Sequence, residues 1–191
     1  MKPVDRSEIL GLSEYESLRV PFRARIIEEK KHRRVAVGER VTAVFENHDT
    51  VLLQIQEMLR TERITREAAI LHEIDTYNQL VPGLGELSAT LMVEIPDAAE
   101  REAFLDAARG LERHVALLVD GHRFAATFDP MRVLPDRASA VLYVKFVLPA
   151  QAIETLLARG EGTSLLIDHP AYHAKARLGA DVLASLADDL S

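Results

Sequence analysis

The first 82 positions of the chain combine helical spacing of apolar residues with one short stretch of strand spacing. Ser13 and Glu16 form a capping box, the Ser-x-x-Glu pattern with which many helices begin. The apolar positions that follow recur at helical spacing: Leu18, Phe22 and Ile26. We therefore expect a helix over about residues 14–34, kinked or restarted at Pro21.

The next segments predict a strand followed by a helical hairpin. Residues 40–47 alternate with period two and contain β-branched side chains, as strands do. Residues 48–63 return to helical spacing, and a second helix begins at the N-cap residue Thr65 and stops at Pro82. Two helices joined by so short a turn should pack as antiparallel neighbours.

From residue 83 the pattern changes to strands that alternate with short helices. The expected strands cover residues 86–95, 114–119, 122–128, 139–148, 164–168 and 172–178. The expected helices begin near Pro96, Pro149 and Ala180. Asp120 and Gly121 between two of the strands are a strong signal for a two-residue hairpin turn.

Two sequence words recur in this second half. "SATLMVE" begins at Ser88 and "SAVLYVK" at Ser139, 51 residues later. "LLVD" begins at Leu117 and "LLID" at Leu165, 48 residues later. Because both halves also have the order strand, helix, strand, hairpin, strand, we predict an internal duplication whose copies superpose about a pseudo-twofold axis, with Ser88 on Ser139.

The predicted fold class is α+β. Residues 1–82 form a mainly helical region with one strand and an αα-hairpin. Residues 83–191 form a duplicated β-α-β-β region, with copies at 86–130 and 138–178, and end in a C-terminal helix. We expect the duplicated units to form a mostly antiparallel or mixed sheet, and the two regions to pack as one compact unit.

Composition excludes several classes of function. The 191 residues are 48% hydrophobic and 28% charged, as in ordinary globular proteins. Cysteine is absent, which removes disulfides, cysteine nucleophiles, thiolate zinc sites and cysteine-ligated iron–sulfur clusters. The Walker, dinucleotide-binding, Gly-x-Ser-x-Gly and His-Glu-x-x-His motifs are absent too. Because the chain also lacks a long apolar run and an apolar signal-peptide core, we expect a cytoplasmic protein that does not associate with membranes.

Charge is unevenly distributed along a chain of net charge −7. Residues 1–66 hold 13 Lys and Arg against 11 Asp and Glu, whereas residues 67–191 hold 10 against 19. A basic cluster, "FRARIIEEKKHRR", is interrupted by Glu28 and Glu29. Since the acidic remainder of the chain repels phosphate, we do not expect nucleic-acid binding.

Polar residues gather around the predicted helical hairpin. The candidate polar surface, placed where this hairpin meets the sheet, contains Glu46, Gln54, Glu57, Arg60, His72, Glu73, Tyr77 and Asn78. The alternative is a solvated helix face with local ion pairs. Glu57 and His72 lie at one height on adjacent helices, but each is about 200° from its apolar stripe. We therefore expect no stoichiometric metal at this pair, a prediction that elemental analysis of the purified chain checks.

A second set of candidate residues lies in the turn after "LLID": Asp168, His169 and Tyr172. Asp168 ends a strand, where aspartate side chains commonly bond nearby backbone amides. We interpret Asp168 as a turn former rather than a general base. His169 and His173 lack a clear third ligand, so we expect neither a metal nor another cofactor here.

Long stretches of the chain also resemble a known bacterial family. They are "GERVTAVFENHDTVLLQIQEMLRTER", "HEIDTYNQLVP", "ELSATLMVEI" and "IDHPAYHAKARL". Together they resemble an uncharacterised family, a domain of unknown function, over about residues 15–186. This resemblance implies a gene that lies beside those for rubrerythrin and for iron–sulfur oxidoreductases of the heterodisulfide-reductase type. The resemblance therefore implies a link to peroxide defence or electron transfer, but neither an activity nor catalytic residues.

Two functions remain open from the sequence. The first is a non-catalytic accessory or partner-binding protein of a redox or peroxide-defence gene cluster, whose partner is a neighbouring iron–sulfur protein or rubrerythrin. The second is a metal- or carboxylate-dependent enzyme with a site at the helical hairpin. The missing motifs and cysteines favour the first, so we lean against an enzyme. We also predict a homodimer, because twofold dimers are the commonest oligomers and exposed strand edges need covering.

Overall fold

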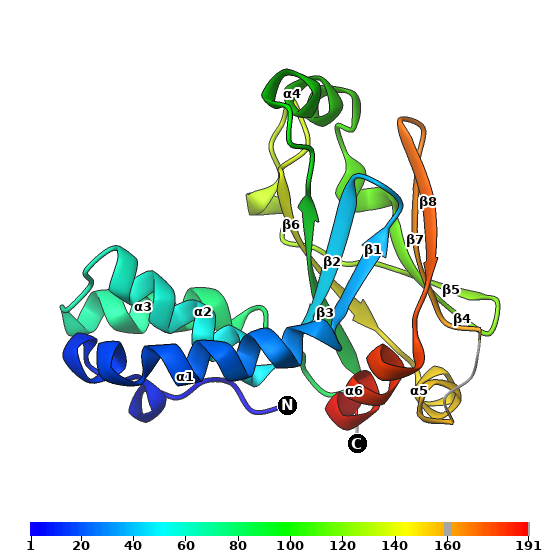
Figure 1. The fold of residues 1–191 in the computed structure, drawn as a ribbon. Helices are drawn as coiled ribbons and strands as arrows, with labels where there is room; N and C mark the ends of the chain where they lie inside the picture. The colour runs from blue at the N-terminus through cyan, green and yellow to red at the C-terminus, as the bar shows by residue number, and fades with distance from the viewer. Residues whose placement is uncertain (159–161, 191) are drawn as a thin grey trace.

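A helical arm lies beside a body made of two β-sheets (Figure 1). This computed structural model describes residues 1–158 and 162–190, so residues 159–161 and 191 of the predicted region 83–191 lie outside the described residues. The helices are η1 (Arg6–Glu8), α1 (Leu12–Lys31), α2 (His48–Thr61), α3 (Glu67–Asn78), α4 (Ala98–Ala107), η2 (Leu111–His114), η3 (Pro130–Arg132), α5 (Ala150–Leu157) and α6 (Ala180–Leu190). The strands are β1 (Arg34–Val37), β2 (Val41–Glu46), β3 (Glu86–Val93), β4 (Val115–Val119), β5 (His122–Ala125), β6 (Val141–Val147), β7 (Ser164–His169) and β8 (Tyr172–Arg177).

The arm consists of α1, α2 and α3 packed side by side (Figure 1). The apolar stripes read from the sequence form its core, which includes Ile55, Leu59, Ile70 and Ile74. Helix α1 runs through Pro21 as one helix and ends at Lys31, three residues before the predicted end, where the chain turns into β1. None of the helices in the described part of the chain is long and apolar enough to cross a membrane.

The body confirms the predicted α+β class, but it contains two sheets where the sequence pattern predicted one. One sheet has the order β1-β2-β3-β6 and the other β5-β4-β7-β8, and every pairing is antiparallel. The inner faces of both sheets contribute to one continuous core. Helix α4 covers one end of the body, and α5 and α6 cover the other (Figure 1).

The two sheets are joined where β1 meets β8. The Tyr172 hydroxyl donates a hydrogen bond to the Val37 carbonyl at 2.5 Å and accepts one from the Arg40 amide at 3.2 Å. Gly38 adopts a positive φ of 73°, and a Cβ at this position would collide with the Tyr172 hydroxyl. Tyr172, predicted as a turn candidate, therefore stabilises the joint between the sheets.

The two halves of the body share the element order strand, helix, strand, strand: β3-α4-β4-β5 and β6-α5-β7-β8. In the β3–β6 pair Leu91 lies opposite Leu142, and in the β4–β7 pair Leu117 lies opposite Leu165. These partners are 51 and 48 residues apart, the same spacings that separate the recurring sequence words. A twofold axis through both pairs would exchange the halves, although the duplication itself stays a prediction.

Candidate functional site

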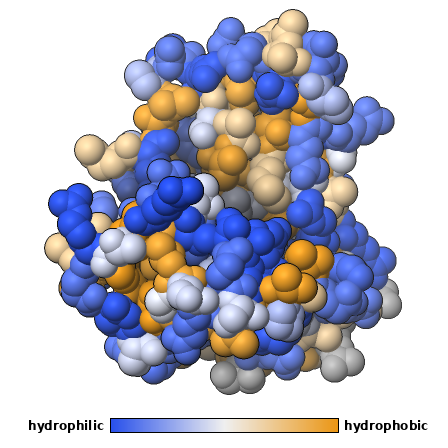
Figure 2. Space-filling view, turned by 60° about the vertical axis from the view of Figure 1, so that its left-hand side comes forward, coloured by the Kyte–Doolittle hydropathy of each residue, from blue (hydrophilic) through white to orange (hydrophobic). Residues whose placement is uncertain are grey.

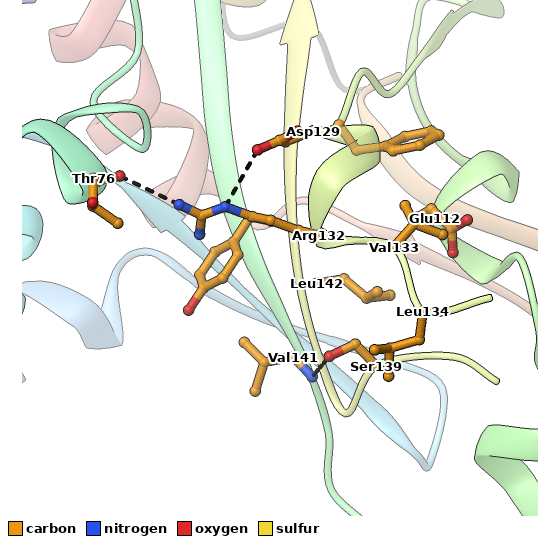
Figure 3. Close-up of a pocket in the computed structure, with 11 residues that line it drawn as sticks. Thr76, Glu112, Asp129, Arg132, Val133, Leu134, Ser139, Val141 and Leu142 are labelled. Atoms are coloured by element: carbon orange, nitrogen blue, oxygen red, sulfur yellow. Dashed lines mark hydrogen bonds and ion pairs between the residues drawn. The ribbon is translucent and has the colours of Figure 1, made fainter. Parts of the chain in front are cut away.

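A groove lies where α3, the segment after β5 and strand β6 meet (Figure 3). It consists of two adjoining pockets with volumes of about 280 and 310 Å³. Both pockets are lined by Phe128, Asp129, Arg132 and Tyr143, and we call the space around these four residues the edge groove. Three segments that are distant in sequence contribute to it, as is common for binding sites formed between structural layers.

Arg132 crosses the edge groove from η3 toward the arm (Figure 3). Its guanidinium lies 5.1 Å from the ring centroid of Tyr143, a cation–π contact. The same group donates to the Thr76 carbonyl at 3.4 Å and lies 3.6 Å from the Asp129 carboxylate. Arg132 therefore connects the loop, the sheet and α3, while one side of the groove stays open.

Tyr143 and Lys145 place the outer face of β6 against the arm. Tyr143 packs against the apolar core of the arm. The Lys145 ammonium donates to the Val81 carbonyl at 3.1 Å and to the Glu86 carboxylate at 3.2 Å. Burial opposes the charge on Glu86, but hydrogen bonds from the Gly83 amide and from Lys145 outweigh it and lower its pKa. The ion pair with Glu86 thus holds the Lys145 side chain in place at the edge groove.

Several residues of the predicted polar surface have structural partners instead of a shared site. Glu46 is buried and accepts hydrogen bonds from the hydroxyls of Thr50 at 2.5 Å and Thr90 at 2.6 Å. Arg60 pairs with Glu16 of α1 at 2.6 Å. Glu46 thereby links β2 to α2 and to β3, Arg60 links α2 to α1, and neither residue lines the edge groove.

Glu57 faces α1 rather than α3. Its carboxylate accepts hydrogen bonds from the Tyr15 hydroxyl at 2.7 Å and from Arg19 at 2.8 and 2.9 Å. His72, by contrast, lies exposed on α3. Within residues 1–158 and 162–190, no group of three or more His, Asp or Glu side chains is arranged to hold a metal ion.

The remaining candidates cluster near the C-terminal end of α3. Asn78 binds the backbone of Val4 through bonds of 2.8 and 2.9 Å, and Glu73 is half-buried. Tyr77 is buried, which raises its pKa, and Gln54 is its hydrogen-bond partner. The edge groove lies near this end of α3, but it is lined by their neighbours, Thr76 of α3 and the C-cap residue Gln79.

Asp168, His169 and His173, at the histidine-containing turn between β7 and β8, each have a hydrogen-bond partner. His169 is 8% exposed, its Nδ1 accepts from the Ala171 amide at 3.1 Å, and its Nε2 lies 3.0 Å from the Arg109 carbonyl. Both ring nitrogens are therefore used in the neutral tautomer that carries a proton on Nε2. Asp168 pairs with His173 and Arg123, and these contacts lower its pKa. Among the residues that the structure describes, the turn is not part of a group of three or more His, Asp or Glu side chains that could hold a metal ion.

The residues that form the edge groove were not predicted as site residues. The only sequence signal is that Tyr143 and Lys145 alternate with Leu142 and Val144, which places a tyrosine and a lysine on the face opposite the core. Phe128 ends the predicted strand 122–128, which in the structure stops at Ala125, and Asp129 and Arg132 lie in a segment without apolar periodicity. Nothing in such a segment indicates where it packs.

The architecture defines an α+β protein in which a three-helix arm and a two-sheet body meet at a groove. The chain belongs to the family described as "Protein of unknown function (DUF3501)", whose model matches residues 3–190. This match confirms the resemblance to a domain of unknown function, whereas the gene neighbourhood stays a prediction.

A solved structure has the same fold along its whole length. It is the crystal structure of a protein from Burkholderia pseudomallei K96243, described as a novel protein of unknown function. The two chains are 35% identical, the match covers 100% of each, and the TM-score is 0.91. No curated protein matches the chain at a significant level.

Proposed function

We propose that this protein is a non-catalytic accessory protein that binds a protein partner in the edge groove. The observation that supports this proposal is the composition and position of the groove. Tyr143, Phe128 and Arg132 converge there, and aromatic residues and arginine are enriched in protein interfaces. At the helical hairpin, the candidate carboxylate Glu57 is already bound by Tyr15 and Arg19 of α1.

The shape of the molecule agrees with a partner-binding role. The face above the arm is hollowed, and hydrophobic side chains are exposed in its wall (Figure 2). Among the exposed large hydrophobic residues, Met131 and Leu134 flank Arg132 in sequence and are 90% and 40% exposed. A partner bound in the groove would cover apolar surface that is otherwise in contact with water.

The family resemblance leads us to propose a redox partner, an iron–sulfur protein or rubrerythrin encoded beside this gene. We expect the immobilised chain to retain that partner at micromolar concentration. Replacing Arg132 with alanine should weaken the interaction about tenfold or more, in the range found for central interface arginines. The measurement is a pull-down followed by titration calorimetry.

Arg60→Ala is the matched control, because Arg60 also forms one ion pair but lies on α2 away from the groove. It should leave the affinity unchanged. If the Arg132 and Arg60 variants bind the partner equally well, the edge groove is not the binding site. If the chain retains no neighbouring redox protein, the proposed partner is wrong.

A further inference from the structure

We propose that the edge groove binds an extended peptide segment of the partner, which pairs with the free edge of β6 and directs a basic side chain toward Glu112. This inference rests on the proposed function, because both place the partner in the same groove. Two independent observations carry it: the hydrogen-bond pattern of β6 and a buried carboxylate in the same pocket.

The direction of the β6 main-chain groups follows from its pairing with β3. In an antiparallel ladder, alternate residues direct both N–H and C=O toward the neighbouring strand. The Val93 amide donates to the Ala140 carbonyl, and the Leu148 amide donates to the Gly85 carbonyl. The main-chain N–H and C=O groups of the even-numbered residues of this segment therefore point toward β3. The main-chain groups of the odd-numbered residues point away from β3, toward the free edge of the sheet: Val141, Tyr143, Lys145 and Val147.

Among the described residues, Thr127 pairs with this outward edge at Lys145, and the Val141 amide donates to the Ser139 hydroxyl at 3.3 Å. The Thr127 amide donates to the Lys145 carbonyl at 2.7 Å, and the Lys145 amide donates to the Thr127 carbonyl at 2.8 Å. After Thr127 the chain turns away into η3 instead of continuing beside β6. Within the described residues, the amide and carbonyl of Tyr143 then have no hydrogen-bond partner.

The pocket of about 280 Å³ lies along this uncovered stretch and is lined by Ser139, Val141, Leu142 and Tyr143. Unpaired edge groups of this kind are the usual template for an added strand. The pocket therefore adjoins the stretch of β6 that a strand continuing the pairing of Thr127 would cover.

Glu112 supplies the second observation. It lines the same pocket, is 4% exposed, and its Oε1 has no hydrogen-bond donor among the described residues. The exposed Arg113 reaches this oxygen only as an ion pair at 3.5 Å. A buried carboxylate oxygen without a donor is unfavourable, and a cationic donor from a ligand would satisfy it. Figure 3 places Glu112 on the side of the groove remote from β6.

The other residues that line the pocket indicate which further side chains the peptide should have. Val133, Leu134 and Leu142 form an apolar wall. Side chains of an extended peptide alternate between two faces, so a basic residue and apolar residues can be presented together.

The test uses a synthetic peptide, acetyl-Val-Lys-Val-Lys-Val-amide, added to the isotope-labelled full chain. We expect saturable binding in amide NMR spectra, with the Tyr143 amide moving downfield as it gains a hydrogen bond. The Val141 amide, which donates to the Ser139 hydroxyl in the free chain, would turn to the peptide on binding. Val141→Pro removes this outward N–H without touching the bonds to β3, and should weaken binding about tenfold or more. Val141→Ala keeps that N–H and should bind within about twofold of the wild type.

Val147→Pro is the matched control, since it removes an outward N–H of the same strand outside the pocket. It should leave binding unchanged. A peptide that is N-methylated at its central residue removes a main-chain N–H from the peptide instead of from the protein. The wild-type chain should bind this peptide about as weakly as the Val141→Pro variant binds the unmethylated one. The corresponding Val-Glu-Val-Glu-Val peptide should bind about fivefold more weakly, and Glu112→Gln should abolish that difference.

If the Tyr143 amide signal does not shift at about 5 mM peptide, any binding is weaker than most specific recognition. That result would overturn strand addition. Equal losses in Val141→Pro and Val147→Pro would do the same. Equal affinity for the lysine and glutamate peptides would overturn the role of Glu112. Any of these results, combined with a successful pull-down that depends on Arg132, would reject this inference and leave the proposed function standing.

Discussion

Replacing Arg33 with alanine should lower the free energy of unfolding by about 3–5 kcal/mol. Arg33 is 1% exposed, and its guanidinium donates to the carbonyls of Phe45 at 2.8 Å and Glu46 at 3.2 Å. It also forms a buried ion pair with Asp189 of α6, whose side chain is 5% exposed. Removing the cation leaves Asp189 buried without its counter-charge, and this unpaired charge accounts for most of the loss.

Thermal unfolding measures the effect. At about 2–4 °C per kcal/mol for a chain of this size, the melting temperature of the Arg33→Ala variant should fall by roughly 6–20 °C. Burial already raises the pKa of Asp189, despite the pairing with Arg33. An acid with a raised pKa in the folded state binds protons more readily when folded, so the loss should be smaller at pH 4 than at pH 7.

The double variant Arg33→Met, Asp189→Leu separates an unpaired charge from lost packing. Apolar replacements of both partners often restore stability, so the double variant should be more stable than Arg33→Ala alone. A double variant as unstable as the single one would show that the hydrogen bonds to Phe45 and Glu46, rather than the stranded charge, dominate the effect.

Replacing Glu57 with glutamine should lower the free energy of unfolding at pH 7 by about 2 kcal/mol and make the fall of this free energy between pH 4.5 and 2 shallower than in the wild type. Hydrogen bonds from Arg19 and Tyr15 lower the pKa of Glu57 to about 2. A carboxyl with a depressed pKa stabilises the fold above its unfolded pKa, and this contribution is lost as the pH falls toward 2. The Glu57 side chain is 26% exposed, so solvent screening makes the loss of stability smaller than the pKa shift alone would imply.

Glu16→Gln is the control, because Glu16 also joins α1 to α2 but through an exposed ion pair with Arg60. It should leave both the stability and its acid dependence nearly unchanged. Denaturant titrations at pH 7, 4 and 2.5 compare the variants. A Glu57→Gln variant that loses stability with acid as steeply as the wild type would contradict the assignment.

The sequence pattern predicted those parts of the fold that depend on local spacing. The period of the apolar residues gave the helices of the arm, and Asp120 and Gly121 form the predicted turn, with φ values of 48° and 78°. The recurring words matched Leu117 with Leu165, which the structure pairs across two strands. Strand β1 was missed because its four residues follow the end of α1 almost directly and carry too short an alternation.

The candidate site was harder to predict because it depends on contacts between distant segments. Glu57 and Arg60 looked like a free polar surface, since nothing in the sequence shows that α1 packs on that side of α2. Thr76 and Arg132 meet only because an irregular segment crosses β6. The division of the strands into two sheets, which leaves β6 at an edge, has no local signature either.

The central claim is that the edge groove beside β6 is the partner site. Hydrogen–deuterium exchange of the full chain, alone and saturated with the redox protein retained in the pull-down, tests it most directly. We predict slower exchange at residues 139–143, where the Tyr143 amide has no partner in the free protein, and unchanged exchange around His72 on α3. Protection confined to the arm, with residues 139–143 exchanging as in the free chain, would contradict the claim.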